Sequence, residues 1–387
     1  MNSKKKKQKL RVEFKKKYQG RNRQGDVTRE FLDKDPETLD AASSERISGK
    51  GKHTRHRTIM VDGDSAAKSD DIDIASRLDI DDPSSLRGRV LEVHGLQSYV
   101  ENEQGVIVRC ATRRLLKTMS TDQRHVVAAG DRVRFRMEGA SEGVILRIDP
   151  RTSVLCRSSK GRRHIIVSNC DQLLIVTSAA QPVIKPNLID RFLVTAEQNQ
   201  LDPVICINKA DLIDPAELQP LLGVYSRLGY RTVLTSAQRG WGMRPLRDMI
   251  RGRQTVVAGQ SGVGKSSILN AIQPGLELRV QRVSDENEKG KHTTTTAKLI
   301  PLAEGGYIVD TPGIRQFQLW DIEPQEIGGL FRDLRPYANY CRFPNCQHQH
   351  EIGCAVKNAV ADDRVDARRY ESYCHLMQEE PEKPDLD

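Results

Sequence analysis

The pattern of apolar and polar positions divides the chain into a poorly patterned start, a run of short strands and a longer region of mixed elements. Residues 26–85 are rich in Asp, Ser, Gly and Lys and hold few large apolar residues, which is typical of a disordered linker. From Gly88 onward, short β-rich runs alternate with Gly or polar turns, which predicts a small all-β barrel of the OB type. The predicted strands are Arg89–Val93, Gln97–Val100, Gly105–Val108, Asp131–Arg136 and Gly143–Ile148. Such a barrel commonly binds nucleic acid on one face, although a purely structural barrel remains an alternative.

Between about residues 165 and 320, apolar strand-like runs alternate with helical stretches. This alternation predicts a doubly wound parallel sheet whose ligand-binding loops follow the C-terminal ends of the strands. The predicted strands are Asp171–Thr177, Pro203–Asn208, Arg231–Thr235, Thr255–Gly259 and Tyr307–Val309, and the predicted helices are Leu188–Gln198 and Pro215–Leu228.

Charge adds a preference for polyanionic partners. The chain has 387 residues and a formal net charge of +9, and eleven of its 61 Lys and Arg residues lie in the first 25 positions. We interpret this run as a flexible arm that either contacts RNA or only keeps the protein soluble. Because the apolar runs are too short to cross a bilayer and no signal peptide is evident, we expect a cytoplasmic protein, and a monomer.

The segment from Gly259 to Ser266, GQSGVGKS, matches the phosphate-binding pattern G-x-x-x-x-G-K-[ST] in full. Its glycines let successive backbone N–H groups turn toward phosphate at a helix N-terminus. Lys265 is suited to stabilise the β and γ phosphates, which makes it a catalytic candidate, and the Ser266 hydroxyl is suited to hold Mg²⁺. The predicted phosphate-binding residues are Gly259, Gln260, Ser261, Gly262, Val263, Gly264, Lys265, Ser266 and Ser267.

The base-reading residues follow two other predicted strands. Asp211 of the NKAD tetrapeptide can accept hydrogen bonds from guanine N1 and N2, a pattern that adenine does not offer. This residue argues against an ATPase. The predicted guanine-binding residues are Asn208, Lys209, Ala210, Asp211, Ser236 and Ala237.

Two further segments fit the switch regions of a GTPase. Asp310 and Gly313, in the tetrapeptide DTPG, are expected near Mg²⁺ and the γ-phosphate respectively. Thr294, within the threonine run 293–296, is our candidate for completing Mg²⁺ coordination with Ser266. The alternative for the threonine run is an ordinary polar surface loop.

The motifs appear in an unusual order, because the base-reading loops precede the phosphate-binding loop. Joining the original termini of a domain and opening its chain elsewhere changes the order of the motifs, and it leaves the site intact when the original termini lie close together. On these motifs and their order, residues 86–375 closely resemble the RsgA (YjeQ) family of circularly permuted GTPases. The resemblance implies an OB fold that contacts ribosomal RNA, GTP hydrolysis stimulated by the small (30S) ribosomal subunit, and a role in late maturation of that subunit.

The group that positions the attacking water is less certain from sequence. Ile314 stands where Ras-type enzymes carry a glutamine, so intrinsic hydrolysis should be slow. The resemblance points instead to a switch histidine, for which His292 is the candidate, with a structural role as the alternative. A second functional hypothesis is therefore an RNA-binding assembly factor that uses GTP as a structural switch with negligible turnover. A GTPase acting at a membrane or on transport has no lipidation signal in its favour.

Close to the C-terminus, three of the eight cysteines lie within fourteen residues. The pattern C-x4-C-x-H-x5-C supplies three thiolates and an imidazole, a set typical of one structural Zn²⁺ without an open coordination position. The predicted ligands are Cys341, Cys346, His348 and Cys354. His350 competes with His348, and Cys374 with His375 is a weaker alternative set.

These observations predict a division of the chain into five parts: a basic arm and linker (1–85), an OB barrel (86–155), the permuted GTPase domain (156–325), a zinc-binding domain (326–375) and an acidic tail (376–387).

Overall fold

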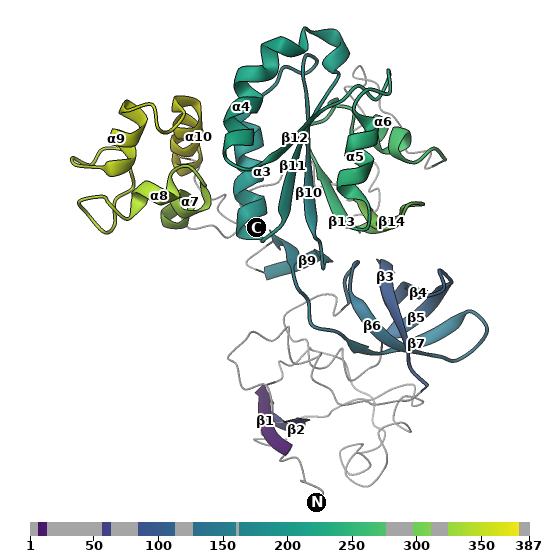
Figure 1. Ribbon diagram of the computed structural model, residues 1–387. Helices are drawn as coiled ribbons and strands as arrows, with labels where there is room; N and C mark the ends of the chain where they lie inside the picture. The colour runs from purple at the N-terminus through teal and green to yellow at the C-terminus, as the bar shows by residue number, and fades with distance from the viewer. Residues whose placement is uncertain are drawn as a thin grey trace, which may run out of the picture. The chain divides into compact units, whose positions relative to one another are not determined.

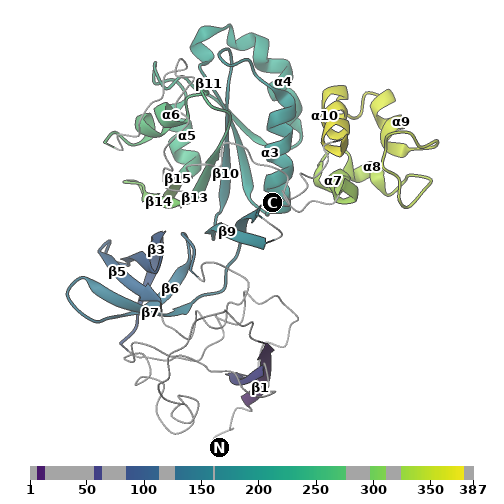
Figure 2. The ribbon, with the colours of Figure 1, turned by 180° about the vertical axis from the view of Figure 1, so that it is seen from behind.

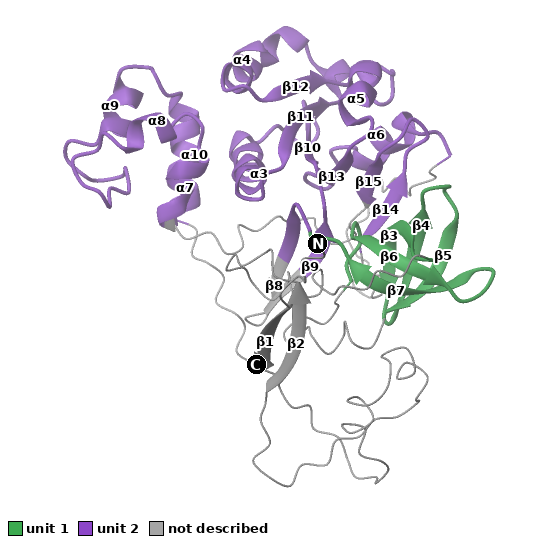
Figure 3. Ribbon diagram, turned by 60° about the horizontal axis from the view of Figure 1, so that its bottom comes forward, with its two compact units in different colours: residues 1–150 green, residues 151–387 purple. Residues whose placement is uncertain are grey.

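The computed structural model describes residues 84–112, 127–159, 162–275, 297–310 and 324–378, together with two short strands nearer the N-terminus. The chain divides into two compact units, residues 1–150 and 151–387 (Figure 3). The predicted switch residues His292, Thr294, Gly313 and Ile314 lie outside the described residues, as does most of the acidic tail.

The first unit contains the predicted barrel. Its five strands are β3 (Leu86–His94), β4 (Gln97–Asn102), β5 (Ile107–Thr112), β6 (Arg132–Met137) and β7 (Glu142–Ile148). They pair in the order β3-β4-β5-β7-β6, and β6 pairs back to β3 to close the barrel. Only the β5–β7 pair is parallel. Alternate residues of each strand, such as Val133 and Phe135 of β6, fill a buried apolar core, which is the strand period that the sequence shows.

The same unit contains an antiparallel pair that the sequence interpretation did not include. Lys7–Glu13 (β1) pairs with His56–Asp62 (β2), within segments expected to form a flexible arm and a linker. The first segment alternates apolar with polar residues at Leu10 and Val12, which is the period of a strand, and the second contains the β-branched residues Thr58, Ile59 and Val61, which favour strands.

The second unit contains the expected α/β sheet. Its strands are β10 (Gln172–Ser178), β11 (Asp202–Asn208), β12 (Arg231–Leu234), β13 (Gln254–Ala258), β14 (Lys298–Pro301) and β15 (Tyr307–Asp310). They pair in the order β12-β11-β10-β13-β15-β14, and all pairs are parallel except β14–β15. The strand order reverses between β10 and β13, which makes this point the expected ligand crevice of an open α/β sheet.

Helices cover both faces of this sheet. Figures 1 and 2 show α3 (Pro186–Gln198) and α4 (Gln219–Arg227) on one face, and α5 (Met243–Ile250) and α6 (Lys265–Ile272) on the other. The sequence predicts one helix over Pro215–Leu228, but the structure has a 3₁₀ turn, η5 (Pro215–Leu218), before α4. Pro220 explains the division, because proline lacks an N–H group and fits only the first turn of a helix.

Two further elements belong to the second unit. A hairpin of β8 (Val154–Ser159) and β9 (Arg162–Ser168) precedes the sheet. A C-terminal module, residues 324–378, contains α7 (Pro324–Leu330), α8 (Arg335–Ala338), α9 (Ala355–Ala361) and α10 (Ala367–Gln378). Its small apolar core includes Phe331, Val356 and Tyr373. Among the described residues, no helix combines the length and apolar character needed to cross a bilayer.

Candidate nucleotide site and metal centre

The parallel sheet brings the predicted nucleotide-binding loops to one edge. The NKAD segment follows β11, the Thr235–Ala237 segment follows β12, and the phosphate-binding loop (residues 259–266) follows β13. Asp310 ends β15 at the same edge. Since these strands are parallel, all of their C-terminal ends point the same way, so residues scattered over a hundred positions meet around one crevice.

The phosphate-binding loop needs glycine at two positions for steric reasons. Gly259 has φ 145°, and a β-carbon there would lie 2.1 Å from the carbonyl oxygen of Val176 on β10. Gly264 has φ 93°, and a β-carbon there would lie 2.4 Å from Nδ2 of Asn208. The Lys265 ammonium turns back over this loop and donates to the carbonyl oxygens of Gly259, at 2.7 Å, and Gln260, at 2.8 Å.

Asn208 joins three of the loops. Its buried side chain donates from Nδ2 to the Val263 carbonyl oxygen at 2.9 Å, and its Oδ1 accepts from the Ala237 backbone N–H at 3.1 Å. The Thr235 hydroxyl lies 3.4 Å from the same Oδ1. One amide therefore holds the phosphate-binding loop and the Thr235–Ala237 segment against the end of β11.

The neighbouring Lys209 has a left-handed backbone, with φ 61°. Its ammonium donates to the Gly262 carbonyl oxygen at 2.8 Å and also to the carbonyl oxygen of Gln181, in the segment between β10 and α3. Burial lowers the pKa of this ammonium. The aliphatic stem is thus fixed beside the crevice, at the place where the sequence expects it to lie along a guanine ring.

Asp211 lies in the 3₁₀ turn η4 (Ala210–Leu212) and is half-buried. The turn is held to the next strand, because the Ala210 N–H donates to the Thr235 carbonyl oxygen at 3.0 Å. Sequence reasoning missed Trp241, whose carbonyl oxygen accepts from the Ser236 N–H at 3.0 Å and whose side chain is 55% exposed. No sequence motif indicates this hydrogen bond, because it depends on how the chain after Ser236 folds back toward the end of β12.

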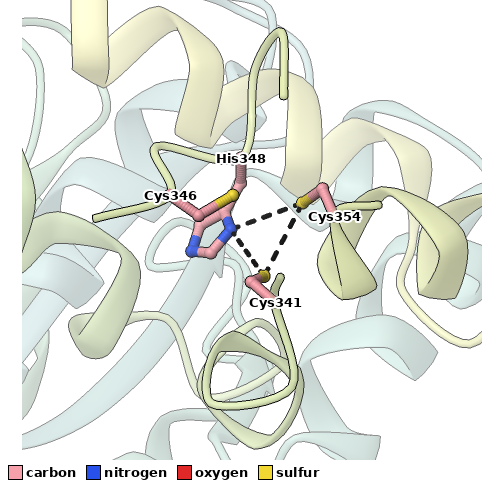
Figure 4. A group of neighbouring side chains, drawn as sticks. All are labelled: Cys341, Cys346, His348 and Cys354. Carbon is pink, nitrogen blue, oxygen red and sulfur yellow. Dashed lines mark hydrogen bonds between the residues drawn. The ribbon is translucent and has the colours of Figure 1, made fainter. Parts of the chain in front are cut away.

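The four predicted metal ligands converge in the C-terminal module (Figure 4). The Nδ1 atom of His348 lies 3.4 Å from the Cys341 Sγ atom and 3.5 Å from that of Cys354, and these two sulfurs are 3.8 Å apart. Around a tetrahedral Zn²⁺, the ordinary bond lengths place S and N ligands about 3.6 Å apart and two S ligands about 3.8 Å apart. The group is therefore consistent with a metal site, and it includes Cys346 but neither His350 nor Cys374.

The electrostatics of the group favour a cation. Burial raises the pKa of the Cys346 thiol to about 12 and also raises that of Cys354, so a cation would have to lower these pKa values for the sulfurs to bind it as thiolates. Burial lowers the pKa of His348, which favours the neutral imidazole that binds metals.

The loop that carries the ligands is held by contacts that the sequence did not reveal. The Glu351 carboxylate accepts backbone hydrogen bonds from Gln347 at 2.6 Å, Gln349 at 2.9 Å and His350 at 3.1 Å. Although its burial acts in the opposite direction, these bonds lower its pKa to about 2. The Tyr370 hydroxyl of α10 donates to the His348 carbonyl oxygen at 2.6 Å. The ligand loop is thus shaped by protein contacts as well as by the sulfur and imidazole ligands.

A phosphate-binding loop and an NKAD loop at one edge of a parallel sheet, with the NKAD strand first in the chain, define a circularly permuted GTPase. The sequence profile described as "RsgA GTPase" matches residues 148–320. A protein of Gemmatimonas aurantiaca named "Small ribosomal subunit biogenesis GTPase RsgA" is 42% identical over 301 residues, covering 76% of this chain and 98% of the relative. A protein of the same name from Sodalis glossinidius is 40% identical over 297 residues, covering 75% and 84% of the two chains.

Solved structures agree with these relatives. YjeQ from Thermotoga maritima superposes with a TM-score of 0.64 at 36% identity, covering 76% of this chain and 97% of that one. YloQ, described as a circularly permuted GTPase, superposes with a TM-score of 0.62 at 31% identity, covering 77% and 97%. The chain belongs to the RsgA GTPase family, which confirms the resemblance, the fold class and the GTPase assignment made from the motifs.

Proposed function

We propose that this protein hydrolyses GTP in late maturation of the small (30S) ribosomal subunit, and that binding to the subunit stimulates the hydrolysis. The observation that carries the proposal is the arrangement at the sheet edge, where Asn208 holds the phosphate-binding loop and the base-reading loops together. The relatives at about 40% identity are named as small ribosomal subunit biogenesis GTPases, which supports the ribosomal part of the proposal.

At the nucleotide, we assign the recognition of guanine to Asp211 and the backbone of Ser236 and Ala237. Lys265, now bound to two carbonyl oxygens of its own loop, would exchange these for the β and γ phosphate oxygens. The Lys265 ammonium would therefore have hydrogen-bond acceptors both with and without bound nucleotide. The carbonyl oxygens of Gly259 and Gln260 would then turn to other donors.

Magnesium would be held by the Ser266 hydroxyl, at the first turn of α6, together with Thr294. Mg²⁺ supplies charge neutralisation between the β and γ phosphates. Asp310 would contact its water shell, Gly313 would meet the γ-phosphate, and His292 would orient the attacking water. Of these three residues, the structure describes only the backbone of Asp310, at the end of β15.

The metal of the C-terminal module is proposed to be one structural Zn²⁺. The ligands would be Cys341, Cys346, His348 and Cys354, whose ligand atoms all lie within 4.8 Å of one another. Four protein ligands complete a tetrahedral shell, so the ion would stabilise the fold of the module and would not activate water.

Binding to ribosomal RNA is supported by a basic stripe on the barrel. On the outer face of β3 and β6, Arg87 lies opposite Arg134, and Arg89 lies opposite Arg132. Arg89 also lies opposite Glu101 of β4, but the arginines give this face of β3 and β6 an excess of positive charge, which attracts a phosphate backbone. This arrangement favours a polyanion over a structural role for the barrel alone.

The decisive experiment is GTP turnover by the purified chain, alone and with purified small or large ribosomal subunits. We expect stimulation by small subunits only, its loss in Lys265→Ala, and its retention in Arg244→Ala, which removes an exposed charge from α5. Stimulation by neither subunit would refute the ribosomal part of the proposal. Tight GTP binding with no turnover under either condition would favour the structural-switch alternative.

A further inference from the structure

A buried arginine joins the C-terminal module to a helix of the GTPase sheet. Arg369 of α10 is 2% exposed, and its Nη1 donates to Oδ1 of Asp190 on α3 at 2.6 Å. Its Nε and Nη2 donate to the two oxygens of Asp333, at 3.0 and 2.9 Å. Although burial disfavours its charge, Asp190 and Asp333 more than compensate and raise the pKa of the guanidinium. The pairing therefore holds the cation fixed between two elements.

A second contact reaches the same turn of α3. The Ser372 hydroxyl of α10 lies 2.8 Å from Oδ1 of Asn187, the second residue of α3. From the other side, the Tyr225 hydroxyl of α4 donates to Asp190 Oδ1 at 2.9 Å. The module is thus attached to the N-terminal end of α3 through a network of directional bonds.

This end of α3 also borders the nucleotide loops. Leu188, Ile189 and Phe192 line a void of about 10 Å³ whose wall includes Gln260 of the phosphate-binding loop. In the segment that leads into α3, the Gln181 carbonyl oxygen accepts from the Lys209 ammonium. The start of α3 and the segment before it are therefore linked to the C-terminal module through Asn187 and Asp190, and they adjoin the nucleotide-binding loops through Gln181 and the void beside Gln260.

Stability alone does not account for such a network. Replacing a buried ion pair with apolar side chains of similar volume is often neutral or stabilising, because desolvation offsets much of the attraction. What a two-pronged guanidinium contact provides is a fixed geometry between the groups that it joins. Here the two-pronged contact is with Asp333 of the same module, and it fixes the guanidinium so that its Nη1 meets Asp190 on α3.

We propose that Arg369 is a positioning residue for the nucleotide site, acting through the first turn of α3. By fixing this turn, it keeps the Gln181 carbonyl oxygen in place for Lys209 and keeps the wall of α3 in place beside Gln260. Docking of the C-terminal module thereby strengthens nucleotide binding. The inference rests on the proposed function, since it assumes that GDP and GTP bind at this sheet edge.

Thermodynamic linkage makes the effect reciprocal. If the docked module tightens GDP binding by some factor, bound GDP must stabilise the docked module by the same factor. Removing a contact that merely supports the fold would leave the GDP affinity of the folded protein unchanged.

The first test measures the dissociation constant of a fluorescent GDP analogue, with zinc content as a check on folding. Arg369→Lys keeps the charge but loses the two-pronged contact, and we expect binding to weaken about 5-fold. Ser372→Ala removes one hydrogen bond, and we expect about 3-fold weaker binding. The matched control is Arg368→Ala, because this exposed neighbour forms an ion pair with Asp366, also of the C-terminal module, and we expect a change below about 1.5-fold.

The second test measures amide hydrogen exchange in residues 367–373 with and without GDP. We expect GDP to slow exchange in the parent chain and to have a smaller effect in Ser372→Ala. If Arg369→Lys does not fold, Ser372→Ala decides the question alone. The inference would be overturned if the zinc-loaded variants bound GDP as tightly as the parent chain, or if GDP did not change amide exchange in α10. Either result would leave the proposed function intact. A parent chain that binds no GDP would overturn both.

Discussion

Replacing Asn208 with alanine should destabilise the GTPase fold even before nucleotide is added. The change removes the hydrogen bonds that the side chain makes to the Val263 carbonyl and the Ala237 N–H, at 2.9 and 3.1 Å. Asn208 is 2% exposed, so its partners have little access to water. Leaving a buried partner without its bond costs about 1–3 kcal/mol, so two such losses predict a decrease of about 2–6 kcal/mol in the free energy of unfolding.

The assay is urea unfolding of nucleotide-free protein, followed by far-ultraviolet circular dichroism. A decrease of this size is a large share of the roughly 5–15 kcal/mol that stabilises a typical domain, so it should move the midpoint clearly. Asn358→Ala is the matched control, because Asn358 is exposed on α9 and alanine is the better helix former. If Asn208→Ala changes the free energy of unfolding by less than about 0.5 kcal/mol, the bridging role assigned to this side chain is wrong.

Three further predictions concern individual site residues. Gly259→Ala would place a β-carbon 2.1 Å from a β10 carbonyl oxygen, so we expect GDP affinity to fall more than about 10-fold. By contrast, Gly223 is an exposed residue of α4 with open space around it, so Gly223→Ala should raise the melting temperature slightly. Asp211→Asn should shift nucleotide preference from guanosine toward xanthosine in competition binding, and unchanged preference would remove the guanine-reading role of this carboxylate. His348→Ala should reduce the zinc content measured by atomic absorption to well below one ion per chain, while His350→Ala should retain it; the reverse result would reassign the ligand.

The metal group shows why some contacts could be predicted and others could not. The spacing of Cys341, Cys346, His348 and Cys354 within a short segment allows only a compact cluster, and the structure brings all four together. By contrast, Glu351 lies among these ligands with nothing in its local sequence to indicate that it would accept three backbone N–H groups. Hydrogen bonds of that kind depend on the path of the loop, which the ligand spacing does not define.

Sequence alone determined the five strands of the barrel, the five parallel strands of the α/β sheet, the class of nucleotide and the order of the motifs, but it missed β1, β2, β8, β9 and β14. These features could be predicted because each is local. The strand period, the placement of glycines and the base-reading carboxylate each depend on a few consecutive residues. The OB-type barrel was predictable for the same reason, from short alternating runs such as Asp131–Arg136, which the structure realises as β6 (Arg132–Met137).

Only the tertiary structure decided which distant residues act together. Arg369 and Asp190 are 179 positions apart, and no pattern in either segment signals the other. Asn208 reaches the phosphate-binding loop across 55 positions because parallel strands bring their C-terminal ends to one edge. Local preferences determine which segments form helices and strands. Burial of the apolar faces of these elements then determines which strand ends and side chains come into contact. Those contacts form the nucleotide site and its link to the C-terminal module.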